Sequence, residues 1–102
     1  MSMMTGGMMY SKGDIVIINF PFSYFNNLKK RPMVVLANRE QDIIGCAITS
    51  NPYSDGIQIE DGVLPLQSKI KYWQIHTFLK DLAITKAAKL SKAKHIQLLE
   101  KI

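Results

Sequence analysis

Short β-branched and apolar segments, separated by turn-forming residues, are the feature that most restricts the fold of this chain. The first segment, Asp14–Phe20, consists largely of Ile and Val and fits a mostly buried strand. Similar segments follow at Met33–Ala37, Asp42–Thr49, Ile57–Glu60 and Ser68–Phe78. Strands this short and this closely spaced predict a mostly β domain folded as a small barrel.

The residues between these segments predict how the strands connect. Ser23–Lys30 is polar, aromatic and basic, which is typical of a loop. Pro32 has no N–H to donate, so we place it at the first position of the second strand. Gly45, inside an apolar run, indicates a bulge or a close backbone approach. Asp61-Gly62 is the clearest hairpin turn signal in the chain.

In the last third of the chain, the spacing of the apolar residues changes. Residues 84–90 fit either a short helix or an extended connector. Ser91 is a good N-cap, and a final helix is predicted to start beside it. We expect this helix to pack through an apolar stripe that recurs at every third residue, namely Ala93, Ile96, Leu99 and Ile102.

Length and composition limit the architecture further. The chain has 102 residues, 47% of them hydrophobic and 21% charged, which fits one small globular domain. We expect residues 11–102 to form that domain and the Met- and Gly-rich residues 1–10 to be a disordered leader or tag remnant, too poor a secretory signal to direct export. No apolar run approaches the roughly 20 residues of a membrane helix. A single cysteine gives no indication of an oxidising compartment, so we expect a cytoplasmic protein.

Cys46 is the only cysteine, so no internal disulfide is expected. Its apolar surroundings in the sequence favour a small buried hydrophobic residue over a nucleophile.

Charge is unevenly distributed along the chain. The formal net charge is +5, yet residues 40–68 contain no Lys or Arg. Residues 69–102 contain eight lysines and only two acidic residues, Asp81 and Glu100. A basic protein with segregated charge favours polyanionic partners. Many basic domains nevertheless bind no nucleic acid, so charge alone does not decide the partner.

Two polar segments adjoin predicted strands and could carry chemistry. Lys29-Lys30-Arg31 leads into the second strand, and Thr49-Ser50-Asn51 follows the third. The planar donors of Arg31 could grip a phosphate, and the hydroxyls could hold a phosphoryl oxygen. A solvated loop and a hydroxyl-stabilised turn are the simpler interpretation. No metal-ligand cluster, glycine-rich phosphate loop or serine nucleophile motif is present, so a metal-dependent or covalent hydrolase is not predicted.

Four segments in register resemble the MazF/PemK/Kid toxin family. Lys12–Phe20, Lys30–Ala37 and Ala47–Ser50 are similar to the family's three leading signatures, and Gln74–Phe78 is similar to its Arg-Thr-containing segment. The resemblance covers residues 12 to about 100. It implies an SH3-like barrel of the CcdB/PemK type with a C-terminal helix, assembled as a homodimer.

The resemblance also implies an activity and partners. Such toxins are metal-independent endoribonucleases that need no cofactor and cut single-stranded RNA, and a cognate antitoxin restrains them, with operator DNA as a further partner of the toxin–antitoxin pair. The family's catalytic arginine falls on Arg31 and its catalytic threonine on Thr49. Because the ribose 2′-hydroxyl attacks the adjacent phosphorus, the enzyme must stabilise phosphate charge and move two protons.

The chain departs from the family pattern in one strand. Lys71 and Trp73 occupy positions where members carry an arginine and a carboxylate, and His76 replaces an arginine. His76 is therefore the candidate proton carrier, because histidine exchanges protons near neutral pH. A strand histidine hydrogen-bonded to the backbone is the simpler interpretation. Trp73 could stack an RNA base or could be a core or dimer residue. The remaining candidate RNA-binding residues are Lys29, Lys30, Ser50, Asn51 and Lys71.

A second class of function stays open at this stage. The missing carboxylate is compatible with a non-catalytic SH3-like barrel that binds nucleic acid or a protein target, as CcdB-type toxins bind DNA gyrase. The retained Arg31-Pro32 and Ile48-Thr49-Ser50 segments favour the enzyme.

Overall fold

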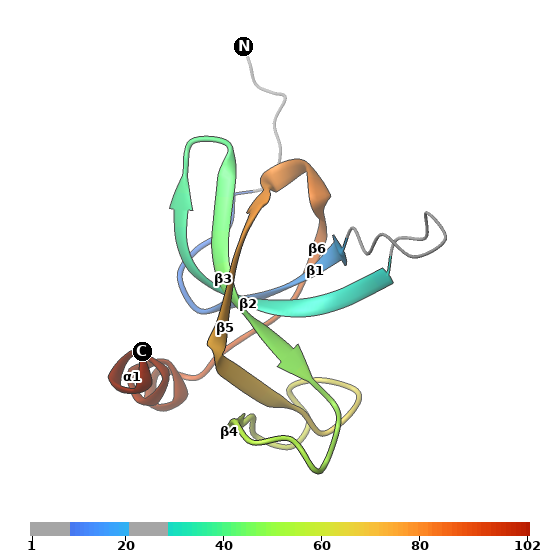
Figure 1. Ribbon diagram of the computed structural model, residues 1–102, viewed down its shortest axis with the longest axis vertical. Helices are drawn as coiled ribbons and strands as arrows, with labels where there is room; N and C mark the ends of the chain where they lie inside the picture. Colours follow the sequence, from blue (N-terminus) through green and yellow to red (C-terminus); the bar gives the residue numbers. More distant parts are fainter. Residues whose placement is uncertain (1–8, 21–28) are drawn as a thin grey trace.

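Six antiparallel strands form one sheet in the order β4-β5-β3-β2-β1-β6, and a single helix follows at the C-terminus (Figure 1). The computed structural model describes residues 9–20 and 29–102. The predicted mostly β fold with a C-terminal helix is confirmed. No pairing joins the edge strands β4 and β6 within these residues, so the sheet curls without closing. The elements are β1 Asp14–Phe20, β2 Lys29–Arg39, β3 Asp42–Thr49, β4 Ile57–Gln58, β5 Lys69–Leu79, the 3-10 turn η2 Lys80–Leu82, β6 Ala83–Lys89 and α1 Lys92–Lys101.

Strands β1 and β3 have the predicted bounds, whereas β2 begins earlier than predicted. It starts at Lys29 instead of Pro32, and Pro32 is its fourth residue, paired with Ile17 of β1. Pairing between β2 and β3 starts only at Met33. The first four residues of β2 therefore have a neighbour on one side only, and such a local edge tolerates a proline. The rest of the predicted loop, residues 23–28, lies outside the described residues.

The segment whose conformation was left open is a strand. Ala83–Lys89 forms β6 and pairs antiparallel with β1. Most of its side chains are exposed because it is an edge strand. That exposure explains why its sequence lacks a clear apolar alternation.

Two hydrophobic clusters lie on opposite faces of the sheet. The face covered by α1, here called the helix face, carries Ile15, Val34, Cys46, Ile48, Ile57, Ile59, Ile70, Leu90 and Leu98. The other face, here called the Met33 face, carries Tyr10, Val16, Ile18, Phe20, Met33, Val35 and Ile43. Alternation along each strand assigns residues to these faces, since successive side chains point to opposite sides.

Gly45 permits a close backbone approach, as the sequence predicted. A Cβ there would overlap the carbonyl oxygen of Val34 and lie 2.8 Å from Cγ of Met33. A register shift in β2 lies opposite, between Val35 and Ala37. Only glycine fits this point without moving the backbone of β2.

The Gly13-Asp14 pair anchors the start of the sheet. Gly13 has a φ of +90°, its N–H donates to the carbonyl of Val35, and its own carbonyl accepts from Leu90. The Asp14 carboxylate is buried and lies 3.3 Å from Nζ of Lys89. It also accepts the N–H of Ser11 at 2.8 Å. This part of the first family-like segment therefore has a structural role.

Helix α1 begins as predicted but packs through a different side. The Ser91 hydroxyl accepts the N–H of Lys94, which confirms the N-cap. Leu98 is the buried residue of the helix, and the predicted packing stripe of Ala93, Ile96, Leu99 and Ile102 is exposed. A period of three could not identify the packing side, because every third position drifts around a helix with 3.6 residues per turn.

Strand β5 contains a bulge that changes which side chains share a face. Cys46 of β3 pairs with Ile75, but the next residue, Ala47, pairs with Lys71. Residues 72–74 therefore have no partner on β3. Simple alternation along β5 would place Gln74 on the side of Tyr72, opposite to Lys71. The bulge shifts the alternation, so Gln74 instead shares a hollow with Lys71.

The expected leader, residues 1–10, falls only partly on residues that the structure describes. Residues 1–8 lie outside the described residues, and Met9 is exposed. Tyr10, however, is 7% exposed and packs in the Met33-face cluster, and its carbonyl accepts from Nδ2 of Asn38. Within the described ranges, no helix has the length and apolar character needed to cross a membrane.

Candidate functional site

A hollow of about 480 Å³ opens on the Met33 face of the sheet. Strands β1, β2, β3 and β5 all contribute to its walls. Its lining combines two cationic side chains with hydroxyl, amide, imidazole and phenyl groups: Phe20, Arg31, Ala47, Ile48, Thr49, Lys71, Gln74, His76 and Phe78. All three residues expected to be catalytic are part of this lining.

Two irregularities of the sheet create this space. Strand β2 pairs with β3 only from Met33 onward, so the two strands are unpaired beside Arg31. Across the hollow, the β5 bulge leaves residues 72–74 without partners on β3. Side chains from β2, β3 and β5 can therefore face one another across a gap that a regular sheet would not contain.

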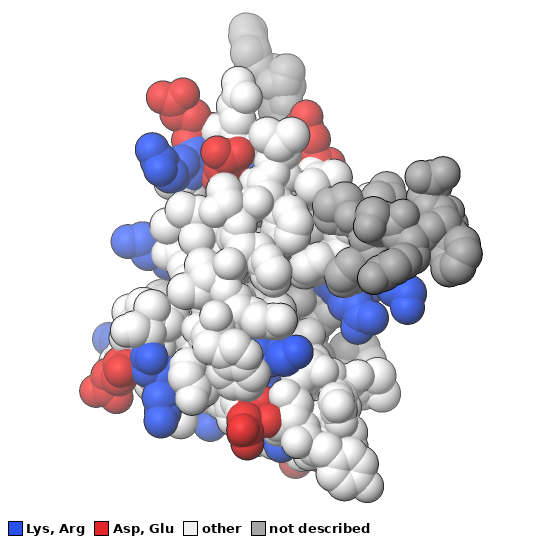
Figure 2. All heavy atoms as spheres, in the orientation of Figure 1, with Lys and Arg blue, Asp and Glu red and all other residues white. Residues whose placement is uncertain are grey.

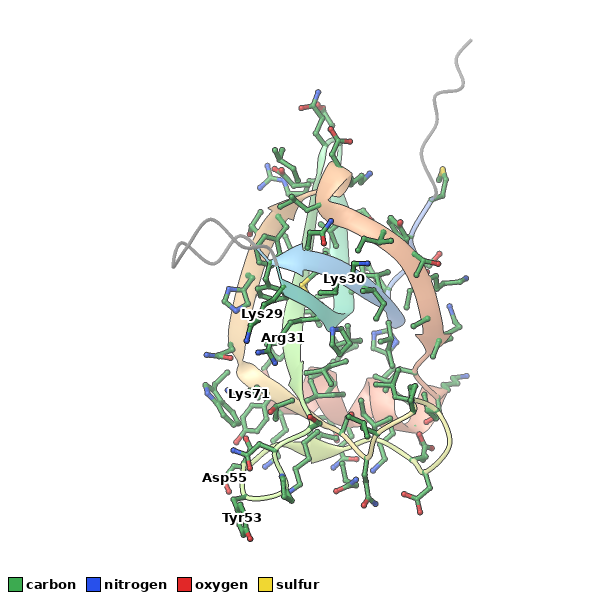
Figure 3. The ribbon with its side chains drawn as sticks, turned by 90° about the vertical axis from the view of Figure 1, so that its right-hand side faces the viewer. Lys29, Lys30, Arg31, Tyr53, Asp55 and Lys71 are labelled. Carbon is green, nitrogen blue, oxygen red and sulfur yellow. The ribbon has the colours of Figure 1, made fainter. Side chains whose placement is uncertain are left out.

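The cationic side chains lie along one side of the molecule. Arg31 pairs with Ile18 and Lys29 with Phe20, so both are on the Met33 face, whereas Lys30 alternates to the helix face. Figure 3 shows Lys29, Arg31 and Lys71 in one column, with Lys30 set apart. Arg31 and Lys71 line the hollow, but Lys29 and Lys30 do not.

The hydroxyl of Thr49 is oriented by the backbone. Its Oγ1 accepts the N–H of Asn51 at 3.1 Å, where β3 ends and the chain turns. With that lone pair occupied, the hydroxyl hydrogen can be donated in another direction. Within the described residues this hydrogen meets no acceptor, and the side chain lines the hollow.

The imidazole of His76 packs against two phenyl rings. Its ring centroid lies 5.7 Å from that of Phe20, edge-on, and 5.5 Å from that of Phe78. The two phenyl rings are themselves 4.8 Å apart. These contacts fix the ring plane while leaving the two ring nitrogens for partners in the hollow, since no described residue forms a hydrogen bond with them.

Sequence reasoning did not single out five residues of the hollow, namely Phe20, Ala47, Ile48, Gln74 and Phe78. Gln74 was missed because the bulge was not anticipated. Phe20 and Phe78 were interpreted as ordinary strand residues. Strand patterning places phenylalanines in cores, and only the cross-strand register brings these two rings against His76.

Besides Lys29 and Lys30, three predicted RNA-binding residues lie outside this hollow. Trp73 is in the bulge and is 49% exposed. Its ring packs edge-on against that of Tyr72, with the ring centroids 5.0 Å apart, and lies outside the hollow. Ser50 and Asn51 line a second hollow, of about 360 Å³, at the end of β3. They are close to Thr49 in the chain but do not line the first hollow.

Cys46 is a buried hydrophobic residue, as expected from its sequence context. It has no exposed surface, and burial raises the pKa of its thiol to about 11. The thiol is therefore protonated at neutral pH and is a poor nucleophile. The part of the chain that the structure describes has no group of three or more metal-ligating side chains.

Charge on the surface is dispersed. The face shown in Figure 2 has Lys and Arg side chains in several separate groups and a largely uncharged centre. Acidic side chains lie near both ends of the same face. A phosphate would thus be attracted chiefly at local concentrations of positive charge, such as the column of Lys29, Arg31 and Lys71.

Solved structures share this fold at low sequence identity. MazF from Deinococcus radiodurans is 14% identical, with a TM-score of 0.74 over 93% of this chain and 94% of that one. An endoribonuclease from a mycobacterial species, solved in complex with its cognate antitoxin, is 12% identical, with a TM-score of 0.69 over 90% and 88%. A further mycobacterial endoribonuclease is 13% identical, with a TM-score of 0.63 over 87% and 82%.

Comparison of the sequence with models of protein families identifies the family. No curated protein matches the chain. The model of the PemK-like, MazF-like toxins of type II toxin–antitoxin systems matches residues 11–102, which is nearly the whole chain and all of the described sheet and helix. The protein therefore belongs to the PemK-like, MazF-like toxin family.

Proposed function

We propose that this toxin is a metal-independent endoribonuclease that cuts single-stranded RNA. The proposal rests on one observation: Arg31, Thr49 and His76 line the same hollow, although they come from three different strands. The attacking group is the ribose 2′-hydroxyl of the RNA, so the protein need not supply a nucleophile. It must neutralise phosphate charge, orient the phosphate and carry protons.

Arg31 and Lys71 supply the positive charge. The guanidinium presents several N–H donors in one plane, which suits two oxygens of one phosphate, while the ammonium of Lys71 acts as a point charge. Negative charge on the non-bridging oxygens grows as the 2′-oxygen attacks. Cations held across the hollow therefore stabilise the transition state more than the ground state.

Thr49 orients the phosphate. Because its oxygen already accepts the N–H of Asn51, its hydrogen is directed to a non-bridging oxygen of the RNA. A neutral donor contributes less than a charge-assisted one. Thr49 accordingly has a smaller role than Arg31.

His76 carries a proton, in place of the carboxylate that the family has in this strand. Neutral imidazole can take the proton of the 2′-hydroxyl, and imidazolium can give one to the leaving 5′-oxygen. The rings of Phe20 and Phe78 hold the imidazole in one plane.

The protein acts as a homodimer and pairs with an antitoxin. A type II toxin is restrained by a protein partner, and the toxin–antitoxin pair also binds its operator DNA. Exposed apolar side chains on α1 and β5 support an interface with a second copy: Trp73, Ile75, Ile96, Leu99 and Ile102 are all 46–55% exposed. The cation of Lys101 lies 5.7 Å from the ring centre of Tyr72, so α1 adjoins this part of β5. A self-complementary apolar surface on a small domain is typical of a two-fold interface.

Cleavage of a long single-stranded RNA in EDTA tests the proposal. Wild-type protein is expected to cut it, and Arg31→Ala is expected to reduce the rate by roughly 10²–10³-fold, the usual cost of one preorganised donor. Thr49→Ala is expected to lose less. Arg39→Ala is the matched control, since Arg39 is exposed at the other end of the same strand, away from the hollow.

Two outcomes would contradict the mechanism. Cleavage that stops in EDTA and resumes with a divalent metal would require a different chemistry. RNA that is bound but never cut would favour the non-catalytic barrel instead.

A further inference from the structure

The second hollow continues the same face of the sheet as the first. In an antiparallel ladder, directly opposed residues point to the same side. Thr49 of β3 is opposite Lys69 of β5, and Lys69 is opposite Gln58 of β4. This row joins Thr49, which lines the first hollow, to Gln58 and Lys69, which line the second. An RNA strand whose phosphate lies beside Thr49 would therefore extend its next nucleotide into the second hollow.

Two glutamines in this hollow have fixed amide orientations. Nε2 of Gln58 donates to the carbonyl oxygens of Ile59 and Ser68, at 3.4 and 3.5 Å. Nε2 of Gln67 donates to the carboxylate of Asp61 at 2.8 Å. Carbonyl and carboxylate oxygens only accept, so neither amide can be reversed. Each glutamine therefore presents its Oε1, and no described residue donates to either oxygen.

The side-chain amide of Asn51 has the opposite orientation to those of the two glutamines. Its Oδ1 accepts the N–H of Tyr53 at 2.9 Å, so the amide presents its NH₂ group. Tyr53, two residues further along the chain, is 93% exposed. Figure 3 shows it at the tip of the loop, on the same side as Arg31 and Lys71. An exposed aromatic ring at such a position can stack on a nucleobase.

Charge in the second hollow is unsuitable for a phosphate. Its cation, Lys69, already donates to the carbonyl oxygens of Pro52 and Ser54, at 3.1 and 2.9 Å. Asp55 lies beside Tyr53 at the loop tip and would repel an anion (Figure 3). Polar groups that are neutral and fixed in direction suit the edge of a base.

We propose that the second hollow binds and selects the base of the nucleotide next to the cleaved phosphate. Two acceptors and one donor complement a base that carries an exocyclic amino group, namely adenine, cytosine or guanine, better than uracil, which offers a single N–H. Gln58, Gln67 and Asn51 are thus specificity residues. This inference rests on the proposed function, because it places the RNA relative to the cut.

Two sets of four RNA oligonucleotides, one set for the base on each side of the cleaved bond, test the inference. Their binding is measured by fluorescence anisotropy, with the attacking ribose replaced by 2′-deoxyribose so that no cleavage interferes. The wild-type protein is expected to prefer an amino-bearing base to uracil at one flanking position. Gln58→Leu and Gln67→Leu are each expected to reduce this preference roughly fivefold, the value of one neutral hydrogen bond of ~1 kcal/mol. Gln97→Leu, on the exposed surface of α1, is the matched control and is expected to keep the full preference.

The proposal is overturned if the wild-type protein shows no base preference at either flanking position, or if both glutamine variants keep it. Because binding is measured without cleavage, a failure of the ribonuclease activity remains distinguishable. An inactive protein that still selects the base through Gln58 and Gln67 would refute the proposed function while supporting the subsite.

Discussion

His76 is the residue whose role depends most on its neighbours. Phe20 and Phe78 hold its ring, and no carboxylate lines the hollow among the described residues to take over proton transfer. His76→Phe keeps an aromatic ring in this packing and removes the exchangeable proton. We expect the rate of RNA cleavage to fall by roughly 10²–10⁴-fold, the usual contribution of general acid–base catalysis, with little change in RNA affinity. Single-turnover cleavage and a binding titration on the same variant check this; an undiminished rate would make His76 structural.

Cys46 provides a pH-dependent prediction. Burial raises the pKa of its thiol from the ordinary 9.0 to about 11. Below pH 9 the thiol is protonated in both the folded and unfolded states, so it does not alter the free energy of unfolding. Between pH 9 and 11 only the unfolded state ionises, so stability falls as pH rises. Urea unfolding of wild type and Cys46→Ala across this pH range measures the fall in the free energy of unfolding. The variant is expected to lose less stability with rising pH. Equal slopes for both proteins would contradict the expectation.

At the scale of single residues, the sequence identified candidates for chemistry where they lie in motifs that resemble those of a known family. Arg31, Thr49 and His76 were identified from their motifs and do share one hollow. Gln74 was not, because its position depends on a bulge three residues long on one strand. The second hollow was missed for a similar reason: Gln58 and Asn51 are separated by a loop and become neighbours only through the pairing of β4 with β5.

Among the elements, β3 depends most on a single position. Gly45→Ala would place a methyl group against the Val34 carbonyl oxygen, which belongs to the backbone of the neighbouring strand and cannot rotate away. We expect a loss of about 1–3 kcal/mol in the free energy of unfolding, the usual cost of overpacking. Thermal unfolding measures this loss. Gly62→Asn is the comparison variant: Gly62 has a φ of +87°, which strains any side chain but asparagine less than most, and a Cβ at this position would meet no atom within 4 Å. A stability change no larger than that of Gly62→Asn would contradict the close approach.

Elements were predicted well where burial imposed a pattern and poorly where it did not. Strands β1 and β3 are central, and their bounds follow from continuous apolar runs. Strand β6 and the packing side of α1 were undecided or wrong because both lie at the surface, where few side chains are buried. A weak pattern in the sequence is the expected consequence of an edge strand or a lightly attached helix.

For the whole molecule, the exposed surface of α1 and β5 predicts the oligomeric state. Sedimentation at tens of micromolar, well above a typical ~1 μM dissociation constant, should give a dimer. Leu99→Glu should shift the protein to the monomer without unfolding it, because Leu99 is 55% exposed and a charge there is costly only in an interface. Lys92→Glu, at the start of the same helix, should remain dimeric. A monomeric wild-type protein, or a dimeric Leu99→Glu variant, would show that α1 does not form the dimer interface.

The most direct test of the central claim is the chemistry of the cut ends. Attack by the ribose 2′-hydroxyl must leave a 2′,3′-cyclic phosphate on one product and a 5′-hydroxyl on the other. It must also fail when the attacking ribose is replaced by 2′-deoxyribose. We expect mass spectrometry of products formed in EDTA to show these two termini, and the deoxy-substituted RNA to remain uncut at that position. Products with a 5′-phosphate, or cleavage of the deoxy-substituted RNA at the same bond, would show that water or a protein group attacks instead and would refute the mechanism assigned to Arg31, Thr49 and His76.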